Sequence, residues 1–250
     1  MSTGTRIPLH PVACGEAIPP LEQGDRLTRD EFERRYNAMP KLKKAELIEG
    51  MVHIPAAVRW RNHAVPHADL IGCMVVYRAS TPGVKVYDNP SIRLGLDNEP
   101  QPDATMLIEP ASGGQTRLSD DDLIEGAPEL IAEVSSSSVS IDLNAKLRVY
   151  CRNGVREYLV WRVHDREIDQ FVLRDGRYDQ LPAAADGILR SEQFPGLWLD
   201  RTALIRGDVA AVLTLLQQGL VSAKHREFVN TLAHPSREGV SFLERTGPSS

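Results

Sequence analysis

Apolar residues recur along this chain with two different periods, one typical of helices and one typical of strands. Helical spacing of apolar residues marks residues 67–79, 140–152 and 204–220, because positions three and four apart share one face of a helix. An earlier helix is expected to begin with Thr28 as its N-cap and to end before Pro40. These four segments are the predicted helices.

Short apolar runs bounded by turn residues predict the strands. The clearest are residues 102–108, 128–135 and 157–163. Two hairpins are expected, one turning at Gly50 and one across Arg174-Asp175-Gly176. Helices and strands therefore alternate, which predicts a mixed α/β (α+β) domain with a central sheet flanked by helices.

The ends of the chain differ in composition from its middle. Residues 1–24 are rich in Pro and Gly and are expected to form an extended arm. Residues 221–250 are polar and are expected to form a loosely held tail. The 250 residues are 42% hydrophobic, so residues 25–220 are sufficient for one domain with a single large core.

Composition excludes some classes of protein. The net charge of −5 and pI of about 5.8 argue against a protein that coats nucleic acid, because such affinity comes from lysines and arginines. A nuclease remains compatible, since a metal site needs carboxylates. The three cysteines form no C-x-x-C pair, which favours a reducing, cytoplasmic setting. No apolar run approaches the roughly 20 residues of a membrane span, so no membrane partner is expected.

Candidate chemistry lies in a Pro-Asp pair, a later Glu and an Asp-x-x-x-Lys segment. Phosphodiester hydrolysis requires an activated water and compensation of negative charge, and a hard divalent cation supplies both. Asp103 and Glu133 fall on two predicted strands and could converge on one ion. Lys146, on the following helix, could position the attacking water or offset developing charge.

The alternation of residues in the strand around Glu133 makes this carboxylate unusual. Ile131, Glu133 and Ser135 are expected to share one face of the strand, opposite the face of Leu130, Ala132 and Val134. A carboxylate in so apolar a strand is costly without a partner. A metal ion is one candidate partner.

Each of these residues also has an ordinary structural interpretation. Asp103 could simply begin a strand, and Glu133 could pair with Arg148 or Arg156. Asp142 and Lys146 could form an i,i+4 pair on a helix surface. Their order along the chain favours a site over three unrelated features.

Several short segments together carry a family resemblance. They are Ala45-Glu46-Leu47-Ile48-Glu49-Gly50, Pro102-Asp103, Ala132-Glu133-Val134-Ser135, Asp142-x-x-x-Lys146 and Gly154-Val155-Arg156-Glu157-Tyr158. From about Leu27 to about Leu204, the chain resembles the Uma-two family of restriction endonucleases, in the PD-(D/E)xK nuclease superfamily. The resemblance implies a restriction-endonuclease-like core with a central mixed sheet.

The resemblance also implies a Mg²⁺ site, with Mn²⁺ as a substitute, built from Asp103 and Glu133. Glu46 would be a third acidic contributor. The superfamily pattern places a lysine two residues after the glutamate, where this chain has Ser135. Lys146 is the expected replacement.

Three further residues are candidates for substrate contact: His67, Arg61 and Asp142. His63 and His67 have the spacing of a zinc pair, but Pro66 lies between them and no third ligand is evident. This basic segment has two possible interpretations. It could form an edge that contacts phosphate, or it could be an ordinary solvated loop. The same alternatives hold for Lys41-Leu42-Lys43-Lys44.

Two functions follow as hypotheses. The first is a Mg²⁺-dependent endodeoxyribonuclease that hydrolyses DNA with an activated water. The second is a non-catalytic binding or assembly protein that keeps the nuclease fold. A homodimer is expected in either case, because cutting two strands suits two-fold symmetry.

Overall fold

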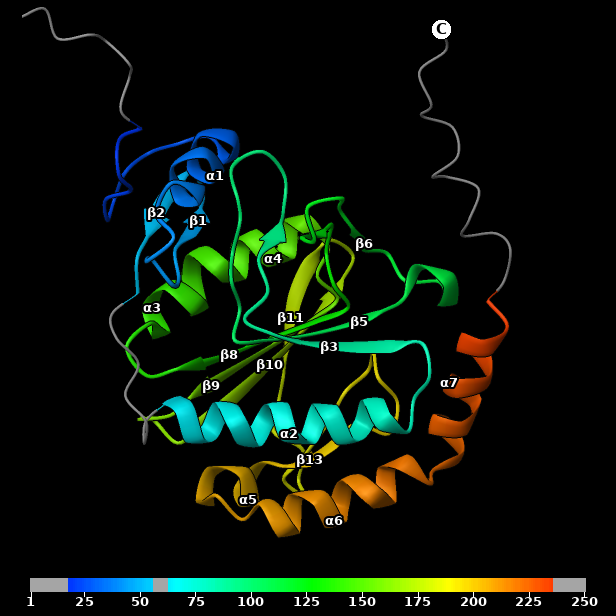
Figure 1. Cartoon of the computed structure of the whole chain (residues 1–250). Coiled ribbons are helices and arrows are strands. Elements are labelled where there is room, and N and C mark those ends of the chain that lie inside the picture. Colours follow the sequence, from blue (N-terminus) through cyan, green and yellow to red (C-terminus); the bar gives the residue numbers. More distant parts are fainter. Residues whose placement is uncertain (1–17, 56–62, 236–250) are drawn as a thin grey trace, which may run out of the picture.

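A six-stranded mixed sheet forms the centre of the molecule (Figure 1). The computed structural model describes residues 18–55 and 63–235. The strand order is β11-β10-β9-β8-β5-β3, in which only β8 and β9 run parallel. Smaller sheets are β1-β2, β12-β13 and β4-β7-β6.

The elements have the following bounds. The helical segments are α1 (Arg29–Asn37), α2 (Val65–Ala79), η2 (Pro110–Ser112), α3 (Val139–Ile141), η3 (Asp142–Lys146), α4 (Leu147–Asn153), α5 (Arg201–Arg206), α6 (Val209–Leu220) and α7 (Ala223–Ala233). The central strands are β3 (Val84–Asp88), β5 (Ala104–Ile108), β8 (Leu130–Ser135), β9 (Glu157–Arg162), β10 (Glu167–Arg174) and β11 (Arg177–Leu181). The outer strands are β1 (Glu46–Ile48), β2 (Met51–His53), β4 (Ile92–Arg93), β6 (Arg117–Leu118), β7 (Ile124–Glu125), β12 (Ile188–Arg190) and β13 (Trp198–Asp200).

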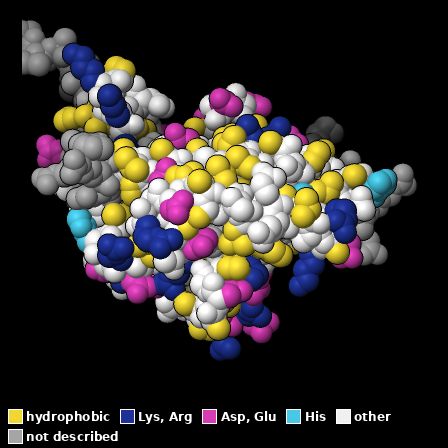
Figure 2. Space-filling model, turned by 90° about the horizontal axis from the view of Figure 1, so that it is seen from below, with side chains coloured by type: hydrophobic (Ala, Val, Ile, Leu, Met, Phe, Trp, Pro, Cys, Tyr) yellow, Lys and Arg dark blue, Asp and Glu magenta, His cyan; other side chains and the backbone are white. Residues whose placement is uncertain are grey.

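Helices cover both faces of the sheet, in three layers (Figure 1). Leu130, Ala132 and Val134 of β8 pack into one core with α2, α5 and α6, whereas Ile131 packs into a second core with α4. The alternation predicted for this strand is therefore confirmed. The outer surface of the α2, α5 and α6 layer mixes hydrophobic with charged side chains (Figure 2).

Local sequence features produce several elements as predicted. Thr28 caps α1, and its hydroxyl accepts a hydrogen bond from the Glu31 N–H at 3.4 Å. The β1–β2 hairpin turns at Glu49 and Gly50, whose φ angles are 52° and 71°. Two consecutive positive φ angles characterise the turn that matches strand twist in a tight hairpin.

The C-terminal region differs from its prediction. Within the tail expected at residues 221–250, residues 223–233 instead form α7, which Ser222 caps with its side chain; residues 236–250 lie outside the described residues. Leu232 of α7 is buried and Phe228 packs against the main core. The sequence prediction missed this helix because the segment is mostly polar and only one narrow side of the helix is apolar. The predicted helix 204–220 is also divided, since Gly207 adopts a φ of 74° and ends α5.

The arm predicted at residues 1–24 is described only from residue 18. Leu21 is buried there, and the Gly24 N–H donates to the Val52 carbonyl at 2.9 Å. Within the two described ranges, no helix has both the length and the apolarity needed to cross a bilayer.

Candidate active site

Four elements bring the predicted acidic and basic residues together. Glu46 begins β1, Glu133 lies in β8, and Lys146 ends the π-helical segment η3. Asp103 directly precedes β5, one position beyond the antiparallel pair Ala104–Ala132, so the register places it beside Glu133. The Asp103 Oδ2 atom accepts a hydrogen bond from the Val134 N–H at 2.8 Å, which fixes it at the end of the β5–β8 pair.

Three carboxylates surround the Lys146 ammonium group. Its Nζ atom lies 2.8 Å from Glu46 Oε1, 2.9 Å from Glu133 Oε1 and 3.6 Å from Asp142 Oδ1. Lys146 is only 3% exposed and the three acids are buried with it. Asp142 and Lys146 are therefore not a surface pair. Arg148, considered as a partner of Glu133, pairs with Glu49 instead.

The helix after β8 orients this cluster. Asp142 begins the π-helical turn, and its Oδ2 atom accepts hydrogen bonds from the Ser135 and Ser138 hydroxyls at 2.5 and 2.6 Å. Ser135 occupies the position where the superfamily pattern has a lysine, and here it holds Asp142. π-Helical turns within helices are frequent at functional sites. In this chain the turn directs both Asp142 and Lys146 toward β8.

Asp103 has basic partners that the sequence analysis considered for phosphate contact but did not assign to Asp103. His63 Nε2 lies 3.1 Å from Asp103 Oδ2, and Lys44 Nζ lies 3.3 Å from Oδ1. His67 Nε2 lies 2.8 Å from the Asp103 carbonyl oxygen and 3.0 Å from Asp88 Oδ1. The signal was present in the basic segments around His63 and Lys44, but their side chains converge only in the folded chain. Arg61 lies outside the described residues.

The two carboxylates beside each other have opposite pKa shifts. Burial, the largest cause, raises the pKa of Glu133 to about 8, and the neighbouring carboxylates add to this although Lys146 opposes it. Burial also acts to raise the pKa of Asp103, but the His63 hydrogen bond, the Lys44 charge and the Val134 N–H together hold it below its usual range. Asp103 is therefore ionised at neutral pH.

Lys146 keeps its proton in this cluster. Burial acts to lower the pKa of Lys146, but the charges of Glu133, Glu46 and Asp142 outweigh it and hold this pKa well above its usual range. Glu133 Oε1 accepts hydrogen bonds from both Lys146 and the Tyr150 hydroxyl.

Residues 29–202 match the model of a family described as "Uma2: Putative restriction endonuclease". This chain belongs to the Uma2 family. The match confirms the family resemblance found in the sequence motifs. No curated protein matches the chain.

A solved structure has the same fold as this Uma2 chain. It is the crystal structure of "a putative nuclease belonging to DUF820" from Anabaena variabilis ATCC 29413. The TM-score is 0.53 at 12% sequence identity, covering 70% of this chain and 97% of that chain. At this identity the likeness concerns the fold, and it confirms the predicted mixed α/β architecture.

Asp103 and Glu133 are the two carboxylates of the site that were predicted to hold Mg²⁺. Among the residues that the structure describes, no group of three or more His, Cys, Asp or Glu side chains is arranged to hold a metal ion. Mg²⁺ is often held by one or two carboxylates, with waters and substrate phosphates as its other ligands. The surplus of three acids over one ammonium around Lys146 also suits an added cation. Asp103 and Glu133 therefore fit such an ion in charge and donor type.

Proposed function

We propose that this Uma2 chain is a Mg²⁺-dependent endonuclease that hydrolyses DNA phosphodiester bonds, with Mn²⁺ as a substitute ion. The observation that carries the proposal is the buried cluster itself. Lys146, Glu133 and Glu46 come from three elements, and the Lys146 Nζ atom lies 2.8 Å from Glu46 Oε1 and 2.9 Å from Glu133 Oε1. Asp103 is in register beside Glu133. Burying so many ionisable groups costs stability, and clusters with shifted pKa values concentrate at active sites.

Each side chain has a role in the proposed reaction. Asp103 and Glu133 hold the ion, which when bound offsets phosphate charge and makes a water more acidic. Lys146 fixes Glu133 and Glu46 through its ammonium group, and its positive charge opposes the negative charge that develops on the phosphate. Glu46 keeps Lys146 in position from the β1 side of the site.

The substrate-contacting roles divide between partly buried and fully buried residues. His67 and Lys44 lie at the more accessible side of Asp103, with side chains 14% and 25% exposed, and we assign them to the DNA backbone. Asp142 is 1% exposed, so it acts on substrate through Lys146. Two copies of the chain would place one such site on each DNA strand.

The test combines calorimetric titration of Mn²⁺ or Mg²⁺ with cleavage of plasmid DNA, linear DNA and RNA. We expect the wild type to bind the ion and to nick DNA. Asp103→Asn/Glu133→Gln should lose ion binding and cleavage. Glu129→Gln, which alters a buried carboxylate outside the site, is the matched control and should retain both. Ion binding that survives in the double variant contradicts the assignment.

One observation favours a second function, that of a non-catalytic binding or assembly protein. The Lys146 ammonium group contacts three carboxylates of its own chain, an arrangement that also suits a structural ion cluster. This function predicts folding without metal and no cleavage of any nucleic acid. A metal-dependent cut that disappears in Lys146→Ala would exclude it.

A further inference from the structure

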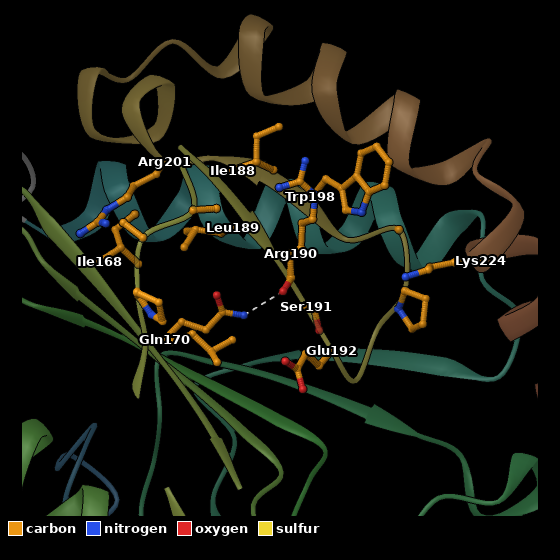
Figure 3. Close-up of a pocket in the computed structure, with 16 residues that line it drawn as sticks. Ile168, Gln170, Ile188, Leu189, Arg190, Ser191, Glu192, Trp198, Arg201 and Lys224 are labelled. Atoms are coloured by element: carbon orange, nitrogen blue, oxygen red, sulfur yellow. Dashed lines mark hydrogen bonds between the residues drawn. The ribbon is translucent and has the colours of Figure 1, made fainter. Parts of the chain in front are cut away.

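A cavity lies apart from the candidate active site (Figure 3). Its volume is about 630 Å³, within the range of roughly 300–1,000 Å³ that is usual for small-molecule sites. It is bounded by β10, the β11–β12 connection, β12, β13 and the start of α7. None of Asp103, Glu133, Lys146 and Glu46 lines it, so what it binds does not depend on the proposed nuclease reaction.

The inner wall of this cavity carries a fixed hydrogen-bond acceptor. Gln170 is 6% exposed, and its Nε2 atom donates to Glu157 Oε1 at 2.8 Å and to the Arg190 carbonyl at 2.9 Å. Both amide hydrogens are thereby used, which determines the orientation of the amide. The Oε1 atom points into the cavity (Figure 3), and no described residue donates to it.

The Glu157 carboxylate fixes the position of Gln170 and of the segment after β12 through hydrogen bonds. Its carboxylate is fully buried and accepts further hydrogen bonds from the Ser191 hydroxyl at 2.7 Å and from two backbone N–H groups, those of Glu192 and Gln193. Gln170 Oε1 is not one of the fully buried atoms that lack a hydrogen-bond partner, so it is accessible from the cavity. The rigid surroundings of Gln170 thus preserve an acceptor that a ligand donor could satisfy.

The rim of the cavity carries cations, of which one is unpaired. Arg190 pairs with Asp186 and lies 5.3 Å above the Trp198 ring, and Arg201 pairs with Glu167. Lys224 is exposed and has no ion pair with any residue in the described ranges. Its ammonium group points toward the cavity (Figure 3). An anion entering there would meet a free positive charge.

We infer that this cavity binds a nucleoside monophosphate. An N–H group of the base donates to Gln170 Oε1, the flat base lies against the apolar walls formed by Ile168 and Leu189, and the phosphate contacts Lys224. The combination of an inner acceptor, apolar walls and a cation at the rim matches the three parts of such a molecule. Trp198 does not stack on the base, because Arg190 covers its ring.

The test is calorimetric titration of the full chain, in EDTA, with each of the four deoxynucleoside 5′-monophosphates. We expect at least one to bind saturably, and Lys224→Glu to weaken that binding at least tenfold. Lys41→Glu changes an exposed lysine elsewhere and should leave binding unchanged. The corresponding deoxynucleoside, which lacks the phosphate, should bind equally well to wild type and to Lys224→Glu.

A second pair of variants tests the interior of the cavity. Gln170→Met should abolish binding of both the nucleotide and the nucleoside. Gln170 also donates hydrogen bonds to Glu157 and Arg190, so a second variant, Ala184→Trp, is tested as well. Ala184 is an exposed residue of the cavity lining. Its larger replacement should block entry to the cavity without disturbing those hydrogen bonds. No saturable binding of any of the four nucleotides overturns the inference. The inference is also overturned if inorganic phosphate binds as tightly as the nucleotide. The same holds if Lys146→Met removes nucleotide binding while Lys224→Glu and Ala184→Trp leave it intact.

Discussion

Lys146 is the residue on which the charge balance of the candidate site depends. It is the cation within hydrogen-bonding distance of both Glu46 and Glu133, and Asp142 lies slightly farther away. All four side chains are nearly inaccessible to water, so solvent screens their interactions poorly. Removing one of these side chains should therefore lower the free energy of unfolding as well as the activity.

We predict that Lys146→Met lowers the free energy of unfolding by about 3–5 kcal/mol, because it leaves buried carboxylates without their cation. Urea denaturation measures this change. Lys146→Met/Glu133→Gln should recover part of the loss. Arg148→Met is the matched control, since that side chain is 59% exposed in its pair with Glu49, and surface pairs contribute no more than about 1 kcal/mol. Equal effects of the two single variants would contradict the prediction.

Glu99 provides a pH-dependent test away from the site. It is 2% exposed, and burial, followed by the neighbouring Glu33, raises its pKa from 4.5 to about 8. Between these values the native state holds a proton that the unfolded chain releases. The free energy of unfolding should therefore fall as pH rises from about 4.5 to about 8.

In Glu99→Gln this contribution is absent, so we predict a smaller loss of stability between pH 5 and pH 8 than in the wild type. Urea denaturation at both pH values provides the measurement. Glu109→Gln, at a half-exposed residue paired with Lys85, should retain the wild-type loss. The idea fails if Glu99→Gln and wild type lose the same stability over this range.

At the scale of elements, two helical glycines occupy opposite environments. A Cβ atom at Gly219 of α6 would lie 2.1 Å from the Gly196 carbonyl oxygen, in the loop before β13. A Cβ atom at Gly72 of α2 would meet nothing within 4 Å. Gly219 thus allows the close approach of α6 to this loop, whereas Gly72 only adds backbone freedom to α2.

The same substitution should consequently have opposite effects at the two positions. We predict that Gly219→Ala destabilises the protein by about 1–3 kcal/mol through overpacking. Gly72→Ala should stabilise it by about 0.5–1 kcal/mol, since alanine loses less entropy than glycine in a helix. Thermal or urea unfolding of the two variants checks the signs, and a stabilising Gly219→Ala would show that the loop can move away.

On the scale of the whole molecule, the C-terminal helices complete the layer beneath the sheet (Figure 1). Leu232 of α7 is 4% exposed, within the core that also contains α2, α5 and α6. Its Cβ atom lies close to Gly83, in the connection between α2 and β3. The end of the described chain is therefore packed against a segment from its first half.

We predict that Leu232→Ala lowers the free energy of unfolding by about 2–5 kcal/mol, as expected for a truncated core leucine. Leu118→Ala is the control, because Leu118 is 56% exposed and surface changes usually stay within about 0.5 kcal/mol. Chemical denaturation distinguishes them. If Leu232→Ala had no more effect than Leu118→Ala, α7 would contribute little to the fold.

The sequence by itself determined those features that depend on neighbouring residues. Apolar periodicity located α2 and β8, the Thr28 hydroxyl located the start of α1, and Gly50 located a hairpin. Each is set by contacts within a few positions, where spacing along the chain is also spacing in space. The candidate residues Asp103, Glu133 and Lys146 were found in the same way, as patterns within short segments.

Only the tertiary structure decided which distant side chains meet. Glu46 reaches Lys146, and Lys44 and His63 reach Asp103, because sheet register and helix packing bring β1, α2 and β5 together. Burial converted an ordinary i,i+4 pair, Asp142 and Lys146, into part of a cluster that water does not reach. The physical reason is that local preferences fix the direction of a side chain, whereas its partner and its dielectric surroundings are set by the packing of the whole chain.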